Sequence, residues 1–164
     1  MAIFKRSTVE KVPVVIQMES VECGAASLDM ILAYYGKWLP LEEVRTACGV
    51  SRDGSSAKSI LRAARGYGLN AAGYKVEPEH LEGMQPCIIH WNQNHFVVVY
   101  KIAHGKVYVA DPGKGMIHYS MAEFASHWTT DSNEAQATGI ALLLEPTDGF
   151  YAKPGIKERR GRGM

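Results

Sequence analysis

The sequence predicts an α+β fold in which N-terminal helices pack on an antiparallel β-sheet. Two observations support this prediction. Apolar residues recur at helical spacing through residues 23–65, and the pattern then changes to short β-rich runs separated by turn residues. Helices first and strands afterwards indicate an α+β class. At 164 residues, the chain is long enough for one domain with a substantial core.

Three helices are expected in the first half of the chain, and each has its own boundary signal. They cover residues 23–35, 40–48 and 56–65. Gly36 and Gly49 supply C-terminal stops for the first two helices, and Ser55 or Ser56 caps the third. The first helix is strongly apolar, and Leu28, Ile31, Leu32 and Tyr35 can share one of its faces, which predicts that it is the buried central helix.

Six β-runs are expected after these helices. They cover residues 69–76, 87–91, 95–102, 106–110, 116–119 and 138–145. Residues 92–94 are typical of a hairpin turn, and a short helical turn is expected near residues 77–82. Ser120 and Glu123 form a capping-box pattern that predicts a brief helix containing Phe124.

Composition and charge exclude several classes of protein. Apolar residues make up 46% of the chain and the net charge is +1, which gives no reason to expect nucleic acid as a partner. No apolar run reaches the ~20 residues of a membrane helix, and the N-terminus has no signal peptide, so a cytoplasmic location is expected. The expected organisation is a lead-in over residues 1–12, a domain over 13–146, and a basic linker over 147–164 leading toward a transmembrane domain.

Cys23 is the strongest catalytic candidate because it stands at the mouth of the first helix. The positive end of a helix macrodipole favours thiolate, which is the nucleophilic form of cysteine. Gln17 lies six residues upstream, where its amide would donate to the oxyanion formed by attack on a carbonyl. In isolation, a buried structural role for Cys23 is favoured, but Gly24 and Ala25 leave the helix start bare enough for a peptide to approach.

His95 and Asp111 supply the base and the orienting group that a cysteine nucleophile needs. His95 begins an apolar strand, and Asp111 follows the next strand in an Asp-Pro-Gly turn. Alone, His95 would be ascribed to packing and Asp111 to a turn. A hairpin between the two strands would bring Asp111 back beside His95. Together with Cys23, they predict a papain-like cysteine peptidase.

The remaining polar residues are assigned no chemistry. Cys48 and Cys87 are interpreted as buried apolar residues, and the cysteines and histidines have no metal-binding spacing. Asp29 and the glutamates at 42 and 43 are interpreted as solvated helix charges. No phosphate-binding glycine motif occurs, so this chain is not expected to bind ATP. No metal or other cofactor is expected either.

Several motifs in order resemble the peptidase C39 domains found at the N-terminus of bacteriocin-exporting ABC transporters. The resemblance covers residues 12–146. The matching motifs are Gln17, Glu22-Cys23-Gly24-Ala25-Ala26, Tyr34-Tyr35-Gly36, residues 49–54, residues 63–69, His90-Trp91-Asn92-Gln93-Asn94-His95-Phe96-Val97-Val98 and Val109-Ala110-Asp111-Pro112-Gly113.

This resemblance implies a double-glycine leader peptidase. Such domains cut bacteriocin or lantibiotic precursors after Gly-Gly or Gly-Ala, and their transporter exports the peptide. By matching position, Cys23 would be the nucleophile, His95 the base and acid, Asp111 the orienter and Gln17 the oxyanion donor. The leader would bind as an amphipathic helix.

The resemblance also implies a substrate channel in the domain and a set of binding partners. Tyr67, Trp91 and Asn92 are proposed walls of the substrate channel, with core packing an equal alternative for Tyr67 and Trp91. The expected partners are the precursor peptide and the transmembrane and nucleotide-binding domains of a parent transporter, which would bind the ATP. No nucleic acid is expected, and the isolated domain is expected to be a monomer on the cytoplasmic side of the cell membrane.

Two other functions remain open at this point. A docking module would bind the leader without cutting it, but such a module has no need for the Cys23, His95, Asp111 and Gln17 set. An amidase or another acyl-transferring enzyme on the same fold would not require a long leader for turnover.

Overall fold

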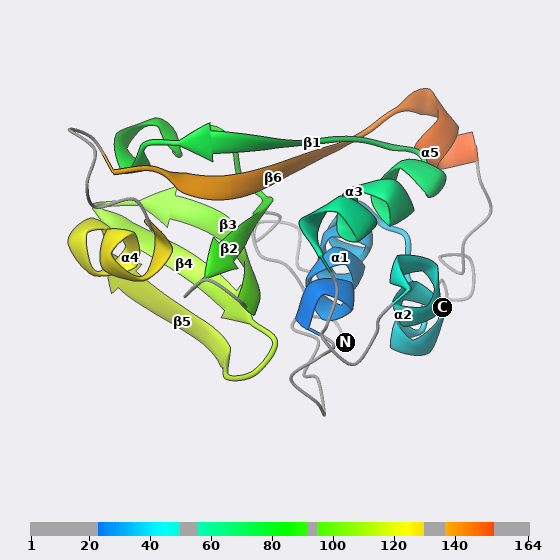
Figure 1. Ribbon diagram of the computed structural model, residues 1–164, viewed down its shortest axis with the longest axis horizontal. Helices are drawn as coiled ribbons and strands as arrows, with labels where there is room; N and C mark the ends of the chain where they lie inside the picture. Colours follow the sequence, from blue (N-terminus) through cyan, green and yellow to red (C-terminus); the bar gives the residue numbers. More distant parts are fainter. Residues whose placement is uncertain (1–22, 50–55, 92–94, 130–136, 153–164) are drawn as a thin grey trace.

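The computed structural model describes residues 23–49, 56–91, 95–129 and 137–152. The helices are α1 (Cys23–Tyr34), α2 (Leu41–Cys48), α3 (Ala57–Gly66), α4 (Met121–Trp128) and α5 (Asp148–Ala152), with a 3-10 turn η3 (Pro78–His80). The strands are β1 (Leu69–Val76), β2 (Cys87–Trp91), β3 (His95–Ala103), β4 (Lys106–Asp111), β5 (Gly115–Ser120) and β6 (Gly139–Pro146). Figure 1 shows α1–α3 beside the sheet, with β1 and β6 running from the sheet across to them.

The α+β prediction is confirmed. The described strands form one antiparallel six-stranded sheet in the order β1-β6-β2-β3-β4-β5. Each expected strand is present within a residue or two of its predicted bounds. The expected loop at 51–54 and turn at 92–94 lie outside the described residues, as does the lead-in.

Local signals explain where the helices begin and end. The N-cap of α3 is Ser56, whose hydroxyl accepts a hydrogen bond from the Ser59 N–H at 3.1 Å. Beyond α1, Gly36 takes a φ of 97°, a left-handed conformation that a β-carbon disfavours. The Ser120–Glu123 capping box at the start of α4 is present as predicted.

The expectation of a buried central helix is confirmed for α1, where every residue from Cys23 to Ala33 is buried. This burial includes Asp29, which is only 4% exposed. The interpretation of Asp29 as a solvated helix charge is therefore wrong. α1 packs against α2 and α3 as well as the sheet, a tertiary effect that helical periodicity alone does not reveal.

The sheet separates two hydrophobic cores, and strand alternation decides which side chain joins which core. On one face, residues such as Ile88, Phe96 and Val98 pack with α1, α2 and α3. On the other face, Ile89 and Val97 pack beneath α4. α1 contacts β3, and side chains of β3 enter both cores, so the strand that begins with His95 is buried on both of its faces.

The packed chain continues to Ala152, past the domain boundary expected at residue 146. Phe150 in α5 is 1% exposed, and Lys37 donates a hydrogen bond from Nζ to its carbonyl oxygen at 2.8 Å. The ammonium also lies 4.2 Å from the centre of the Phe150 ring. Gly68 lets this segment approach, because a β-carbon there would lie 2.5 Å from the Phe150 Cα. This short helix lacks a periodic pattern and depends on contacts distant in sequence, so composition alone suggests a linker.

Candidate active site

Cys23 is the first residue of α1, and its side chain is 5% exposed. One turn later, the buried Ser27 hydroxyl donates a hydrogen bond to the Phe96 carbonyl oxygen at 3.2 Å. This bond joins α1 to β3 immediately after His95. The helix that carries Cys23 and the strand that carries His95 are therefore joined by a hydrogen bond close to both residues.

The β3–β4 pairing brings His95 and Asp111 together, as the sequence predicts. Val98 pairs with Ala110, which places the start of β3 opposite the end of β4. The His95 Nε2 lies 2.8 Å from the Asp111 Oδ1, and Asp111 is only 2% exposed. The Gly113 N–H donates to the same carboxylate oxygen at 2.8 Å. The Asp-Pro-Gly turn and the orienting carboxylate are thus one structure.

Cys23 lies close enough to His95 for its thiol to interact with the ring and to contribute to the raised pKa of His95. Because Nε2 is occupied by Asp111, Nδ1 is the ring nitrogen left to face the thiol. An imidazole held between a carboxylate and a sulfur can take the proton of the thiol and pass it to a leaving group without rotation of the ring. The three side chains therefore form the geometry of a nucleophile, a base and an orienter.

The charges of the site favour a protonated His95. Burial alone would lower the pKa of His95, but the hydrogen bonds to Asp111 and Cys23 and the negative charges of those groups together raise it to about 9. Burial alone would raise the pKa of Asp111, but the His95 and Gly113 hydrogen bonds hold it below its ordinary value. At neutral pH, Asp111 is a carboxylate that stabilises the imidazolium beside it.

The other expected site residues are less closely connected to this group. Gln17 and Asn92 lie outside the described residues. Trp91 pairs with His95 across the β2–β3 hairpin, but it is 3% exposed and its ring stacks on His127 and packs against Phe124. This burial favours the core-packing alternative for Trp91.

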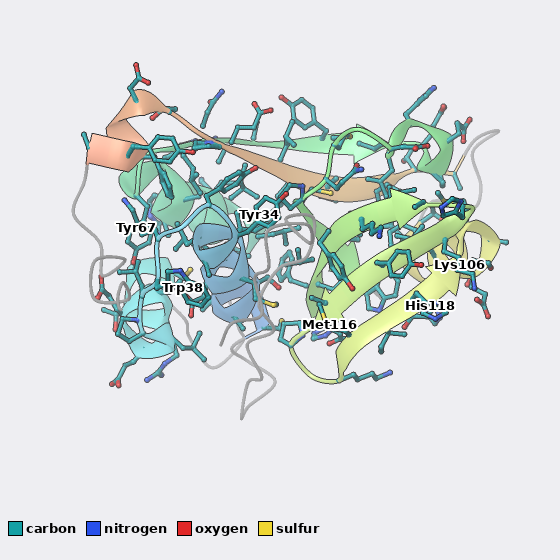
Figure 2. All side chains as sticks on the ribbon, turned by 180° about the vertical axis from the view of Figure 1, so that it is seen from behind. Tyr34, Trp38, Tyr67, Lys106, Met116 and His118 are labelled. Carbon is teal, nitrogen blue, oxygen red and sulfur yellow. The ribbon has the colours of Figure 1, made fainter. Side chains whose placement is uncertain are left out.

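Tyr67 caps the C-terminus of α3 and is half-buried. Burial, followed by the negative charge of Glu43 and smaller contributions from Cys48 and Asp29, raises its pKa to about 12. Figure 2 places Tyr67 on the side of α1 away from the sheet. A role for Tyr67 as a wall of the substrate channel stays a prediction.

Ser27 is the residue that sequence reasoning missed. Its position one turn after Cys23 is visible in the sequence, but its partner is 69 residues away. A serine inside an apolar helix is itself a signal, because its hydroxyl needs a hydrogen-bond partner when buried. Recognising it requires knowing which strand packs against α1.

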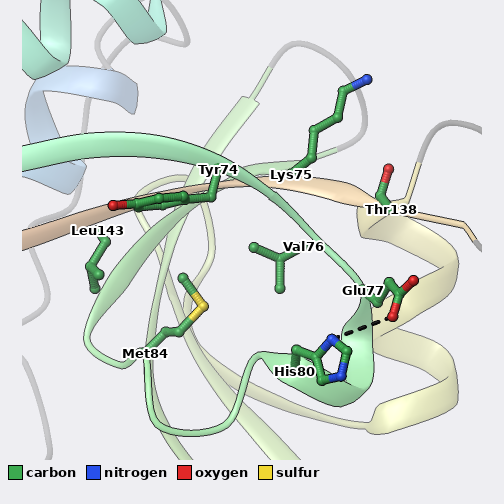
Figure 3. Close-up of a pocket in the computed structure, with 8 residues that line it drawn as sticks. All are labelled: Tyr74, Lys75, Val76, Glu77, His80, Met84, Thr138 and Leu143. Atoms are coloured by element: carbon green, nitrogen blue, oxygen red, sulfur yellow. Dashed lines mark ion pairs between the residues drawn. The ribbon is translucent and has the colours of Figure 1, made fainter.

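A separate hollow of about 470 Å³ lies between β1, β6 and the η3 turn (Figure 3). Tyr74, Val76, Met84 and Leu143 give it a largely apolar wall, and His80 forms a 3.3 Å ion pair with Glu77 at its rim. It contains none of Cys23, His95 and Asp111. This hollow is therefore not the candidate catalytic site.

The sequence matches a family model described as the peptidase C39 family over residues 11–147. It is 32% identical over 151 residues to the lactococcin-G-processing and transport ATP-binding protein LagD of Lactococcus lactis, covering 88% of this chain and 20% of the relative. It is 31% identical over 153 residues to the pediocin PA-1 transport/processing ATP-binding protein PedD of Pediococcus acidilactici, covering 88% of this chain and 20% of the relative. The chain thus spans about a fifth of the length of these curated relatives.

Solved structures extend the similarity to the fold. A double-glycine motif protease from an AMS/PCAT transporter, solved in complex with the leader peptide, is 55% identical with a TM-score of 0.74, covering 84% of this chain and 94% of that chain. The peptidase domain of Streptococcus ComA is 23% identical with a TM-score of 0.72, covering 84% of this chain and all of that chain, and it shows the shared fold. The chain belongs to the peptidase C39 family, and it has the papain-like fold of a cysteine peptidase.

Proposed function

We propose that this domain removes the leader peptide from ribosomally made precursors of the bacteriocin or lantibiotic type, cutting after Gly-Gly or Gly-Ala. The observation that carries the proposal is the His95 ring held 2.8 Å from the Asp111 carboxylate, with Cys23 as its other partner, in a chain of the C39 family. A domain that only bound peptides would gain nothing from this arrangement.

In the proposed reaction, the Cys23 sulfur attacks the carbonyl carbon of the glycine or alanine before the scissile bond. The thiol proton resides on His95. The carbonyl oxygen becomes an oxyanion, to which the Gln17 side-chain amide donates a hydrogen bond. The C–N bond then breaks as His95 gives its proton to the leaving amine, which releases the exported peptide. The enzyme is left as a thioester with the leader.

Water completes the proposed cycle. His95, now neutral, takes a proton from a water molecule that attacks the thioester carbonyl. The C–S bond breaks, the leader leaves with a new carboxylate, and the proton returns to the Cys23–His95 pair. Asp111 stays ionised throughout and orients the imidazole. Every group in this sequence belongs to the protein or the substrate, so the proposed reaction uses no metal or other cofactor.

Two observations support small residues before the cut. The solved relative at 55% identity is a double-glycine motif protease, and it was solved in complex with the leader peptide. In this chain, the two residues after Cys23 are Gly24 and Ala25, which are both buried and add almost no side-chain bulk at the helix start. A close approach of helix and substrate backbone favours residues without large side chains on both partners.

The relatives also support a place for the domain in a larger protein. The names of LagD and PedD include both processing and transport, and this chain matches about a fifth of the length of each. Within the described ranges, no helix has the length and apolar character needed to cross a membrane. We place the domain on the cytoplasmic face of a membrane transporter, where transmembrane and nucleotide-binding domains supply the export step. The isolated domain is proposed to be a monomer that binds no nucleic acid.

Mass spectrometry of cleavage products tests this function. A synthetic leader ending in Gly-Gly and followed by a short core peptide is incubated with the domain and, separately, with Cys23→Ala. The expected result is one cut after the second glycine, which the variant does not make although it still binds the peptide. Binding without a cut by the unaltered domain would favour a docking module. Equal turnover of a short Gly-Gly amide without a leader would favour an amidase.

A further inference from the structure

The strands around the catalytic residues are basic, although the chain as a whole is nearly neutral. Residues 95–120 contain three lysines and three histidines against one acid, Asp111, which is engaged by His95. Since the whole chain has 18 basic and 17 acidic residues, the remainder carries 15 and 16. Residues 95–120, which form β3, β4, β5 and their turns, therefore carry an excess of positive charge that the rest of the chain, summed together, does not.

Pairing registers place part of this charge on one face of the sheet. Met116 pairs with Ala110 and His118 pairs with Tyr108 across β4 and β5, and Lys106 is opposite Ser120. Residues paired across strands point to the same face, so these three rows share the face to which Ala110 belongs. Ala110 packs in the core beside α1, so this is the face that carries the helices and not the face beneath α4.

The three rows form a track that leads away from the catalytic residues. Gly115 pairs with Asp111, so β5 begins at the site, and Ser120 is its last residue. Five residues of strand correspond to about 17 Å. Figure 2, which views the sheet from the side opposite α4, shows Met116, His118 and Lys106 at increasing distance from α1. We call Met116, His118 and Lys106 the β5 track.

The β5 track is accessible in the structure. Met116 is 41% exposed, and His118 and Lys106 are also exposed. Among the described residues, neither His118 nor Lys106 forms an ion pair with a carboxylate. An exposed methionine beside the site and positive charge farther along favour a ligand that has an apolar group followed by an acidic one.

We propose that the β5 track binds an acidic segment of the substrate peptide on the leader side of the cut. This inference rests on the proposed function, because it requires a peptide held at Cys23. The apolar part of the segment would contact Met116, and its carboxylates would lie against His118 and Lys106. The track is about 17 Å long, which about 5 residues of an extended segment or about 12 residues of a helix would span. The acidic residues therefore stand about 5 to 12 positions before the scissile bond.

The experiment compares steady-state cleavage of two synthetic leader peptides that end in Gly-Gly. One has glutamates in the window 5 to 12 residues before the cut, and the other has glutamines there. The enzymes are the unaltered domain, Lys106→Glu and Lys106→Arg, with Lys75→Glu as the matched control. Lys75 is an exposed strand lysine on β1, at the opposite edge of the sheet.

For the glutamate peptide, Lys106→Glu should raise KM about 10-fold with kcat unchanged, while Lys106→Arg and Lys75→Glu leave both parameters unchanged. The glutamine peptide should show a raised KM with the unaltered domain and little further effect of Lys106→Glu. A peptide with lysines in the window should bind Lys106→Glu with part of the affinity that the glutamate peptide has lost. Added salt should weaken binding of the glutamate peptide more than binding of the glutamine peptide.

Equal KM values for Lys106→Glu and the unaltered domain on the glutamate peptide would overturn the proposal, as would an equal rise with Lys75→Glu. Binding of the unaltered domain to vesicles of anionic lipid, without any change in peptide KM, would assign the charge to a membrane and also overturn it. If the unaltered domain cuts neither peptide, the proposed function fails first, and this outcome is distinct from a cut with unchanged KM.

Discussion

The start of α1 and the interior positions of Cys48 and Cys87 show how surroundings decide what a cysteine can do. All three thiols are buried, and none forms a disulfide. Burial raises the pKa of Cys48 to about 11, with only a partial offset from Arg62, and raises that of Cys87 to about 12. Cys23 instead begins a helix and contacts His95. Burial alone makes a thiol inert, whereas burial beside an imidazolium and a helix terminus prepares a nucleophile.

Removing each thiol in turn gives the largest contrast. Cys23→Ala should lower kcat for the Gly-Gly peptide by at least about 10³-fold, because the covalent step is lost. Cys48→Ala and Cys87→Ala should keep activity and lose roughly 1–2 kcal/mol of unfolding free energy through core cavities. Cleavage kinetics and thermal denaturation measure both effects. Detectable turnover by Cys23→Ala would refute its role as nucleophile.

Asp111→Asn should have the next largest effect. The variant keeps the turn but loses the charge that orients and stabilises the imidazolium, so kcat should fall by about 10²-fold. Because Asp111 lies in a turn, the far-ultraviolet circular dichroism spectrum should stay unchanged. Turnover equal to that of the unaltered domain would remove Asp111 from the mechanism.

The pH dependence of kcat/KM tests the charge state of His95. With the pKa of His95 raised to about 9, the imidazolium that protonates the leaving amine persists at neutral pH and is lost above pH 9. Activity should therefore decline on the alkaline side near that value, and Asp111→Asn should move the decline to lower pH. The same shift stabilises the fold fully below the unfolded pKa of about 6.5, and this stabilisation is lost as pH rises through about 9. An alkaline limb that stays in place in Asp111→Asn would show that the carboxylate does not set it.

Ser27→Ala separates positioning from chemistry. Losing the hydrogen bond to the Phe96 carbonyl should cost about 1 kcal/mol of unfolding free energy and lower kcat several-fold through a looser contact of α1 with β3. Ser27→Thr keeps a hydroxyl and serves as the matched control. A loss of stability with kcat unchanged in Ser27→Ala would assign the serine to folding alone.

Asp29→Asn should have the smallest effect on catalysis, because the change that we expect is in stability alone. Burial, reinforced by the charge of Glu43, raises the pKa of Asp29 to about 7, and its Oδ1 atom lacks a hydrogen-bond partner. A raised carboxyl pKa means that stability falls as pH rises from about 4 to about 7. The variant should therefore gain roughly 1–2 kcal/mol at pH 8 and nothing at pH 4. Equal gains at both pH values would contradict a buried titrating Asp29.

Local patterns predicted most of the fold. The glycine after α1, the capping box before α4 and the continuous apolar run in β3 each depend on residues close in sequence. The position of β6 between β1 and β2 is not local, and neither is the burial of Asp29 or of Phe150 in α5. These features arise from contacts between elements that are far apart in the chain.

The candidate site follows the same division. The hairpin expected from β3 and β4 was enough to predict the contact between His95 and Asp111, which are 16 residues apart. The Ser27 hydrogen bond was not predictable in this way, because it joins a helix to a strand 69 residues later. Gln17 remains a prediction from spacing and resemblance.

Selective alkylation most directly tests the claim that surroundings distinguish the three cysteines. The domain is treated at pH 7 with a limiting amount of iodoacetamide, and modified peptides are identified by mass spectrometry, with His95→Ala treated in parallel. We expect modification at Cys23 and not at Cys48 or Cys87, and a much slower reaction of Cys23 in His95→Ala. Equal labelling of all three cysteines, or an undiminished rate at Cys23 without His95, would contradict this claim.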